Sequence, residues 1–155
     1  VRNSYNWQID SITLLNSPQY YIYFYDVNNV EIYGITIDTN PVDASTGTEV
    51  YPINTEGITI MASNVYVHDI SITTYDDAIA VKPCKSTFTY CQCASNILIE
   101  NIEVYQAMGI SIGGVQPSTY TNCISNVIYN NINLHRPFYG IFIKTYPGSY
   151  GSASI

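Results

Sequence analysis

Asn64-Val-Tyr-Val-His-Asp-Ile-Ser-Ile72 aligns without a gap with Asn96-Ile-Leu-Ile-Glu-Asn-Ile-Glu-Val104. The pattern that the two segments share is the strongest indication of the fold. Each segment alternates apolar and polar residues, breaks the alternation for two residues and then resumes it. Such alternation predicts two short β-strands that meet at a bend. The leading Asn suits a turn, because Asn tolerates left-handed backbone angles. Three further segments share the pattern: Asn6-Trp-Gln-Ile-Asp-Ser-Ile-Thr-Leu14, Asn29-Val-Glu-Ile-Tyr-Gly-Ile-Thr-Ile37 and Asn126-Val-Ile-Tyr-Asn-Asn-Ile-Asn-Leu134.

The spacing of the leading Asn residues, 23, 35, 32 and 30, is typical of a solenoid. A solenoid coil takes about 20–30 residues, so the longer intervals carry inserted loops. A second set of strands lies between the repeats: Tyr21–Phe24, Gly57–Ile60, Ala78–Val81, Gly109–Ile112 and Gly140–Ile143. Coil stacking predicts one interior ladder of Ile22, Ile58, Ile79, Ile110 and Ile141. The sequence therefore predicts an all-β fold, a right-handed, single-stranded parallel β-helix.

We expect residues 1–155 to form part of one β-helix domain, because a coil buries its apolar face only against neighbouring coils. Neither end carries a capping pattern, so we expect an excerpt of a longer protein, truncated at both ends. Polar insertions at about residues 39–53, 83–95 and 116–122 predict surface loops. All three flank the second strand set, where they are expected to wall a cleft.

Composition excludes several classes of protein. The chain is 46% hydrophobic, 11% charged and carries a formal net charge of −7. A nucleic-acid partner is not expected, because such binding needs a basic face. A membrane partner is not expected either, because no apolar run approaches the ~18 residues of a membrane span. An acidic polysaccharide is compatible with the composition, because a few lysines can serve one cleft of an acidic protein.

Four cysteines indicate disulfide bonds. Cys84, Cys91 and Cys93 crowd one polar stretch, and Cys123 lies 30 residues further on. The spacing of the first three does not match a zinc site, so no metal is expected. Loop-stapling disulfides indicate a secreted, extracellular protein. The sequence leaves the pairing open.

Three acidic residues are the candidates for chemistry. Glu56 and the pair Asp76-Asp77 precede equivalent interior positions in adjacent coils. Coils of a parallel stack lie about 4.8 Å apart, so the three carboxylates are expected on one patch. Crowded carboxylates cannot all ionise freely, which supplies a general acid beside a general base. This predicts glycosidic hydrolysis, with inversion if the two carboxyl groups are about 6.5–9.5 Å apart.

Several motifs resemble those of family 28 glycoside hydrolases, the polygalacturonase and rhamnogalacturonase family. Asn54-Thr-Glu-Gly57 resembles the family's Asn-Thr-Asp-Gly, and Asp76-Asp-Ala-Ile-Ala-Val-Lys82 resembles its Asp-Asp-Cys-Ile-Ala-Ile-Lys. Gly109-Ile-Ser-Ile-Gly113 is similar to the end of Gly-His-Gly-Ile-Ser-Ile-Gly, and Ile143-Lys-Thr145 to the end of Arg-Ile-Lys-Thr. Order and spacing agree over nearly the whole chain.

The resemblance implies a metal-independent, inverting hydrolase of pectic α-glycosidic bonds that uses no cofactor. Asp76 would be the general acid, and Asp77 and Glu56 would position and deprotonate the water. Lys144 would bind a substrate carboxylate or hydroxyl, and Asn54 would contact substrate. We expect the protein to act as a monomer.

Three positions depart from the family pattern. Glu56 stands in place of Asp, Met108 in place of His and Phe142 in place of Arg. Without the Arg the bidentate carboxylate clamp is absent. This favours a neutral or decorated sugar stacked on Phe142, as in a rhamnogalacturonan or xylogalacturonan, over plain polygalacturonate.

Two other functions compete with the hydrolase. The first is a polyuronate lyase, which would need Ca²⁺ and a catalytic Arg or Lys. The second is a solenoid that binds polysaccharide with little or no turnover, which the departures at Met108 and Phe142 favour. Lys82 is expected to be a charge partner of the acidic pair or a structural residue. His68 and His135 are expected at surface turns.

Overall fold

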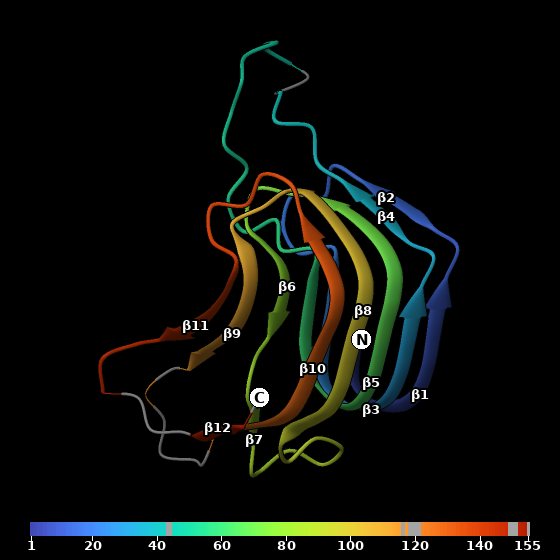
Figure 1. Cartoon of the computed structure of the whole chain (residues 1–155), viewed down its shortest axis with the longest axis vertical. Coiled ribbons are helices and arrows are strands. Elements are labelled where there is room, and N and C mark those ends of the chain that lie inside the picture. The colour runs from blue at the N-terminus through green and yellow to red at the C-terminus, as the bar shows by residue number, and fades with distance from the viewer. Residues whose placement is uncertain (43–44, 116, 118–121, 149–151, 155) are drawn as a thin grey trace.

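The strands of the chain are wound into stacked coils. The computed structural model describes residues 1–42, 45–115, 117, 122–148 and 152–154, and the described residues form strands and no helix. No helical segment that could cross a membrane therefore occurs in this part of the chain. Figure 1 shows the coils side by side, and the fold is the predicted right-handed parallel β-helix. Of the third predicted loop, residues 116 and 118–121 lie outside the described residues.

The strands of the five repeats form the long wall of the β-helix. They are β1 (Arg2–Asp10), β2 (Thr13–Leu15), β3 (Ile22–Tyr33), β4 (Thr36–Asp38), β5 (Ile58–Thr73), β8 (Ala94–Gln106) and β10 (Asn122–Leu134). The predicted division into two strands is right for the first two repeats and wrong for the last three, where β5, β8 and β10 continue through the bend. At these bends Asn131 donates to Asn101, and Asn101 donates to Asp69. Gly34 at the earlier bend has no side chain to make such a bond.

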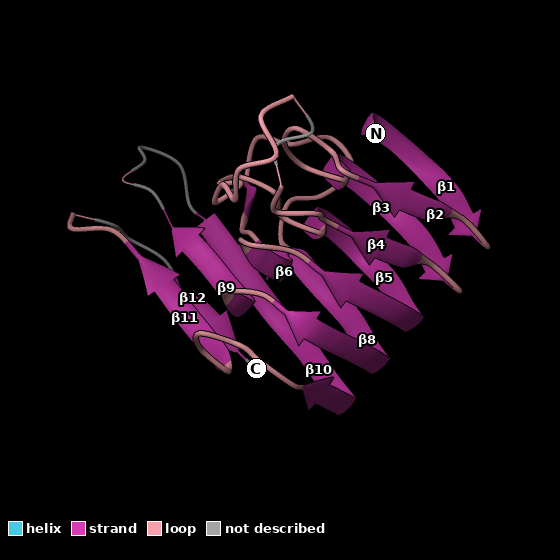
Figure 2. Ribbon diagram, turned by 90° about the horizontal axis from the view of Figure 1, so that it is seen from above, coloured by secondary structure: helices cyan, strands magenta, loops and turns pink. Residues whose placement is uncertain are grey.

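A second wall carries β6 (Asp77–Val81), β9 (Gly109–Val115) and β11 (Ile141–Thr145). The first two strands predicted for this wall are instead the beginnings of β3 and β5, because no loop interrupts those coils. The remaining strands are β7 (Cys84–Lys85) and β12 (Ser152–Ser154). All pairs of strands are parallel except β7 with β10, and Figure 2 shows the common direction of the long strands.

The predicted isoleucine ladder is confirmed by the strand register. Ile22 lies opposite Ile58, Ile58 opposite Ile79, Ile79 opposite Ile110 and Ile110 opposite Ile141. The three middle members are fully buried. Ile141 is 48% exposed, because no described strand pairs with the far edge of β11. Burial of these side chains against their own equivalents is what stacks the coils.

A ladder of asparagines lines the turn at the start of each repeat. The five leading Asn residues have φ between 51° and 59°, in the left-handed region. The Asn96 amide donates to Asn64 (3.0 Å) and accepts from Asn126 (2.8 Å). Asn29 donates to Asn6 in the same way (2.8 Å). Asn therefore meets two demands at these turns, the backbone angle and the bond to the next coil.

All four cysteines form disulfides, as the sequence predicted. Cys84 is joined to Cys91, and Cys93 is joined to Cys123. The first bond closes a loop of the chain between β6 and β8, and the second ties the end of that loop to β10. We call residues 83–95 the cysteine loop.

The asparagine ladder predicts a ranking of stability. Asn96→Gly keeps the left-handed backbone but removes two hydrogen bonds, each worth about 1 kcal/mol. Asn96→Ala removes the same bonds and adds a backbone penalty, so it should be less stable than Asn96→Gly by a further ~1 kcal/mol. Urea unfolding followed by circular dichroism measures both. Equal stability of the two variants would contradict the backbone argument.

Candidate active site

Two segments that precede strands run side by side at one edge of the second wall. Glu56 lies two residues before β5, Asp76 lies just before β6, and Asp77 is the first residue of β6. The Gly57 N–H donates to the Asp77 carbonyl at 3.0 Å. A Cβ on Gly57 would lie 2.5 Å from the Ala78 carbonyl oxygen, so the approach requires glycine. The structure thereby brings the three candidate carboxylates together.

Asp77 is the most deeply buried of the three, with 1% of its surface exposed. Its Oδ2 accepts a hydrogen bond from Ser111 Oγ at 2.7 Å and another from Lys144 Nζ at 3.1 Å. Its Oδ1 is also buried and has no hydrogen-bond partner in the part of the chain that the structure describes. One oxygen of this carboxylate is therefore fixed, and the other is left to interact with a further group.

Asp76 is half-buried and held by two backbone N–H groups. Its Oδ1 accepts from the Asp77 N–H at 2.8 Å, and its Oδ2 accepts from the Asn54 N–H at 3.0 Å. Asn54 has a φ of 58°, so the local turn aims its N–H at this carboxylate. These bonds fix the direction of a carboxyl group that borders the pocket.

Glu56 is 7% exposed, and Lys82 Nζ lies 3.6 Å from its Oε1. Burial raises the pKa of Glu56, and the negative charges of Asp76 and Asp77 raise it further. A hydrogen bond from the Glu56 backbone and the charge of Lys82 lower the pKa, but the net change is upward. The crowding of acids predicted a raised pKa in this cluster, and it occurs at Glu56.

Lys144 lies on β11, and its side chain contacts Asp77. Burial lowers the pKa of Lys144, but the charge of Asp77, the hydrogen bond to it and the charge of Asp76 outweigh burial, and the pKa is raised. The ammonium group is therefore held in its charged form. Its side chain remains 37% exposed, so it keeps a surface free for another ligand.

A pocket of about 470 Å³ opens over this cluster. Asn54, Glu56, Asp76 and Lys144 line it, and Asp77 lies beneath Lys144. The pocket is lined in addition by residues not singled out from the sequence: Tyr20, Tyr23, Lys85 and Tyr146. Among the described residues no group of three or more His, Cys, Asp or Glu side chains is placed to hold a metal ion.

Two of the departing residues lie beside the pocket and do not line it. Phe142 has its ring 6.0 Å from Lys144 Nζ and 5.0 Å from the Tyr139 ring. The Met108 N–H donates to the Asp76 carbonyl at 2.9 Å. The Met108 sulfur accepts a hydrogen bond from Tyr51 of the first loop at 3.4 Å. Met108 thus supports the backbone of the acidic pair, and its side chain is occupied by Tyr51.

Some residues of the site were not predicted from the sequence, for identifiable reasons. Ser111 is the bonded neighbour of Asp77, and the predicted register, which sets it outward between Ile110 and Ile112, could have found it. Lys82 was expected to pair with Asp76-Asp77 or to be structural, and it pairs with Glu56 instead. No sequence pattern pointed to Lys85, because its position depends on how the cysteine loop folds.

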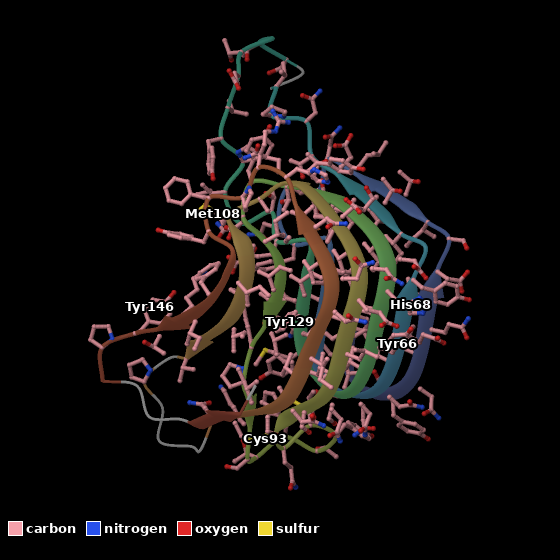
Figure 3. All side chains as sticks on the ribbon, viewed as in Figure 1. Tyr66, His68, Cys93, Met108, Tyr129 and Tyr146 are labelled. Atoms are coloured by element: carbon pink, nitrogen blue, oxygen red, sulfur yellow. A yellow bond between two sulfur atoms is a disulfide. The ribbon has the colours of Figure 1, made fainter. Side chains whose placement is uncertain are left out.

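The two histidines lie away from the site. Figure 3 places His68 and Tyr66 on the wall opposite Met108 and Tyr146. His135 is exposed, as predicted, and pairs with Glu103 at 2.7 Å. His68 is not the open surface residue that was predicted. Its ring stacks between Tyr33 and Tyr66, and its side chain is only 15% exposed.

The whole chain, residues 1–155, matches the family model described as Glycosyl hydrolases family 28. It is 33% identical over 147 residues to a polygalacturonase from Cryptomeria japonica, covering 94% of this chain and 25% of that protein. It is 31% identical over 115 residues to a probable rhamnogalacturonase C from Aspergillus niger, covering 74% of this chain and 21% of that protein. The chain spans about a quarter of the length of these relatives.

Two solved structures share the fold. The endo-xylogalacturonan hydrolase of Aspergillus tubingensis superposes with a TM-score of 0.78 at 22% identity, over 97% of this chain and 38% of that one. Endopolygalacturonase I of Stereum purpureum, complexed with two galacturonates, superposes with a TM-score of 0.74 at 23% identity. The superposition covers 99% of this chain and 42% of that one. With a family match from the first residue to the last and relatives above 30% identity, the chain belongs to family 28 of the glycosyl hydrolases.

Proposed function

We propose that the protein hydrolyses α-glycosidic bonds of a pectic polysaccharide with inversion at the anomeric carbon. The observation that carries the proposal is the convergence of Glu56 and Asp76 at one pocket that lysines also line, with Asp77 directly beneath Lys144. Carboxylates of different burial and partners can divide the roles of acid and base. The relatives named polygalacturonase and rhamnogalacturonase support the class of substrate.

In the proposed reaction Asp76 protonates the leaving oxygen as the glycosidic C–O bond breaks. A water attacks the anomeric carbon from the opposite face of the sugar, and its proton passes to Glu56 or Asp77. Asp76 suits the first role, because it borders the pocket with its orientation fixed by two N–H donors. Glu56 Oε2 and Asp77 Oδ1 suit the second, because neither has a hydrogen-bond partner among the described residues. No metal or cofactor enters this reaction.

Lys144 has two tasks in this proposal. It holds one oxygen of Asp77 and presents its exposed part to a carboxylate or hydroxyl of the substrate. Phe142 lies beside it where the family motif has Arg. We propose that Phe142, with Tyr139, stacks on a neutral or decorated sugar at that end of the site. A rhamnogalacturonan or xylogalacturonan then fits better than plain polygalacturonate.

We also infer secretion, because both disulfides of the chain belong to an oxidising compartment. The expectation of a monomer that forms one β-helix domain stays a prediction. The departures at Met108 and Phe142 keep binding without turnover as the second candidate function, and the experiments below separate it from hydrolysis.

The first experiment is Asp76→Asn in the full-length protein. Loss of a general acid costs about 10²–10⁴-fold in rate, so release of reducing ends from the best of homogalacturonan, xylogalacturonan and rhamnogalacturonan should fall by this factor. The exposed Asp38→Asn is the matched control and should retain activity. An unchanged rate with Asp76→Asn would rule out its role. An ultraviolet-absorbing unsaturated product would identify a lyase, and binding without turnover would identify the second candidate.

The roles within the acidic cluster can be separated with an aryl α-galacturonide. Its phenolate leaves without protonation, so Asp76→Asn should lose much less rate on this substrate than on the polysaccharide. Asp77→Asn removes one of the two groups proposed to activate the water, so its rate should fall by about the same factor on both substrates. If the two variants respond alike, the assignment of acid and base is wrong.

Glu56 predicts a pH dependence that can be measured without substrate. Its pKa is raised in the folded state above the ordinary value of 4.5, so folding favours the protonated form. The stability that this contributes is present below the ordinary pKa and is lost as the pH rises through the folded pKa. Glu56→Gln removes the effect. The difference in Tm between the Glu56→Gln variant and the unaltered protein, measured by thermal unfolding, should therefore increase from acidic to neutral pH. A relative Tm that falls over this range would refute the shift.

A further inference from the structure

The lysines of the chain are gathered in one place. The sequence has three lysines and two arginines against twelve acidic residues. All three lysines, Lys82, Lys85 and Lys144, line the pocket over the acidic cluster. In a protein of net charge −7, the three lysines give this pocket positive groups that a negatively charged ligand can contact.

Two of these lysines are matched by buried acids, and the third is not. Lys82 pairs with Glu56 at 3.6 Å, and Lys144 pairs with Asp77 at 3.1 Å. Among the residues that the structure describes, no carboxylate forms an ion pair with Lys85. Lys85 therefore brings to the pocket an ammonium group that is in no ion pair with a carboxylate of the described residues.

The segment that carries Lys85 is fixed by covalent bonds. Lys85 follows Cys84, which is bonded to Cys91. In the antiparallel pair of β7 and β10, Cys84 lies opposite Cys123 and Lys85 lies opposite Asn122. Cys123 is in turn bonded to Cys93, at the other end of the same loop. The backbone of Lys85 is thus held between two disulfides and a strand pair.

A buried carboxylate fastens the far side of the cysteine loop. Asp26, 4% exposed, accepts hydrogen bonds from the N–H groups of Thr89 (2.9 Å), Tyr90 (2.7 Å) and Cys91 (2.9 Å). The Phe88 ring also packs on Tyr25 with centroids 4.7 Å apart. A loop held in this way loses little further freedom when a ligand binds, which favours affinity.

Two aromatic rings line the same pocket. The ring centroids of Tyr20 and Tyr23 lie 5.2 Å apart, and the Tyr20 centroid lies 5.9 Å from Lys82 Nζ. Aromatic rings pack against the apolar face of a sugar ring while their hydroxyl groups stay polar. A cation and an aromatic pair are the groups needed to bind a sugar that carries a carboxylate.

We propose that Lys85 forms a binding subsite for the carboxylate of a uronic acid residue in the substrate, separate from the Lys144 side of the pocket. The inference rests on the proposed function, because it assumes that the pocket binds a pectic chain. It adds a specificity-determining residue that the family motifs do not contain. The substrate then has an acidic sugar at the Lys85 subsite and a neutral or decorated sugar near Phe142.

The test compares an acidic pectic oligosaccharide with the same chain after its carboxyl groups are reduced to alcohols. In the full-length protein, Lys85→Gln should lower kcat/KM on the acidic chain about tenfold, the contribution of one charge-assisted hydrogen bond. The reduced chain should be cleaved within about twofold of the unaltered protein. Lys85→Arg keeps the charge and should restore most of the activity. The exposed Arg136→Gln removes the same charge outside the pocket and serves as the control.

The outcomes separate this inference from the proposed function. Equal losses on both chains, or no loss on either, would overturn the Lys85 subsite while leaving the hydrolase intact. If no chain is cleaved, the proposed function fails, and calorimetric binding of the acidic oligosaccharide tests the subsite alone. Binding that weakens with Lys85→Gln and recovers with Lys85→Arg supports the subsite, and binding that does not change with Lys85→Gln refutes it.

Discussion

Parallel, in-register pairing of successive coils positions both the core and the active site of this protein. It sets Ile22, Ile58, Ile79, Ile110 and Ile141 in one column, and it fixes the outer residues at the same spacing of about 4.8 Å. Side chains far apart in sequence thereby become neighbours on the outer wall. Ser111 reaches Asp77, and Lys144 reaches Asp77 from the coil beyond. The interior provides stability and register, and the exterior uses that register for chemistry.

The site is an arrangement of opposite charges at low exposure. Burial of carboxylates is costly unless cations or hydrogen bonds compensate. Lys82 and Lys144 compensate Glu56 and Asp77, while one oxygen of each carboxylate has no partner among the residues that the structure describes. Asp76 is compensated differently, by backbone N–H groups. The three acids therefore have three environments, which is the physical basis for giving them different roles.

The cysteine loop extends the site beyond the regular coils. A β-helix positions residues on its strands well but places nothing above its outer wall. Here two disulfides, the strand pair β7–β10 and the buried Asp26 hold an irregular segment against the coils. This segment supplies Lys85 and Pro83 to the pocket. Loops on a rigid scaffold are a common source of specificity.

The sequence alone could predict the β-helix, the isoleucine ladder, the presence of disulfides and the neighbourhood of Glu56, Asp76 and Asp77. It could do so because period-two alternation and a repeat of fixed form act locally, and stacking follows from them. Other features could not be predicted because they depend on tertiary contacts. Lys82 pairs with Glu56, and the Met108 side chain contacts Tyr51. His68 is enclosed by two tyrosines, and the pairing of the cysteines is seen only in the folded chain. Only the tertiary structure placed Lys85 at the pocket. These features depend on how loops of irregular conformation close over the coils, and contacts between distant segments leave no periodic trace in the sequence.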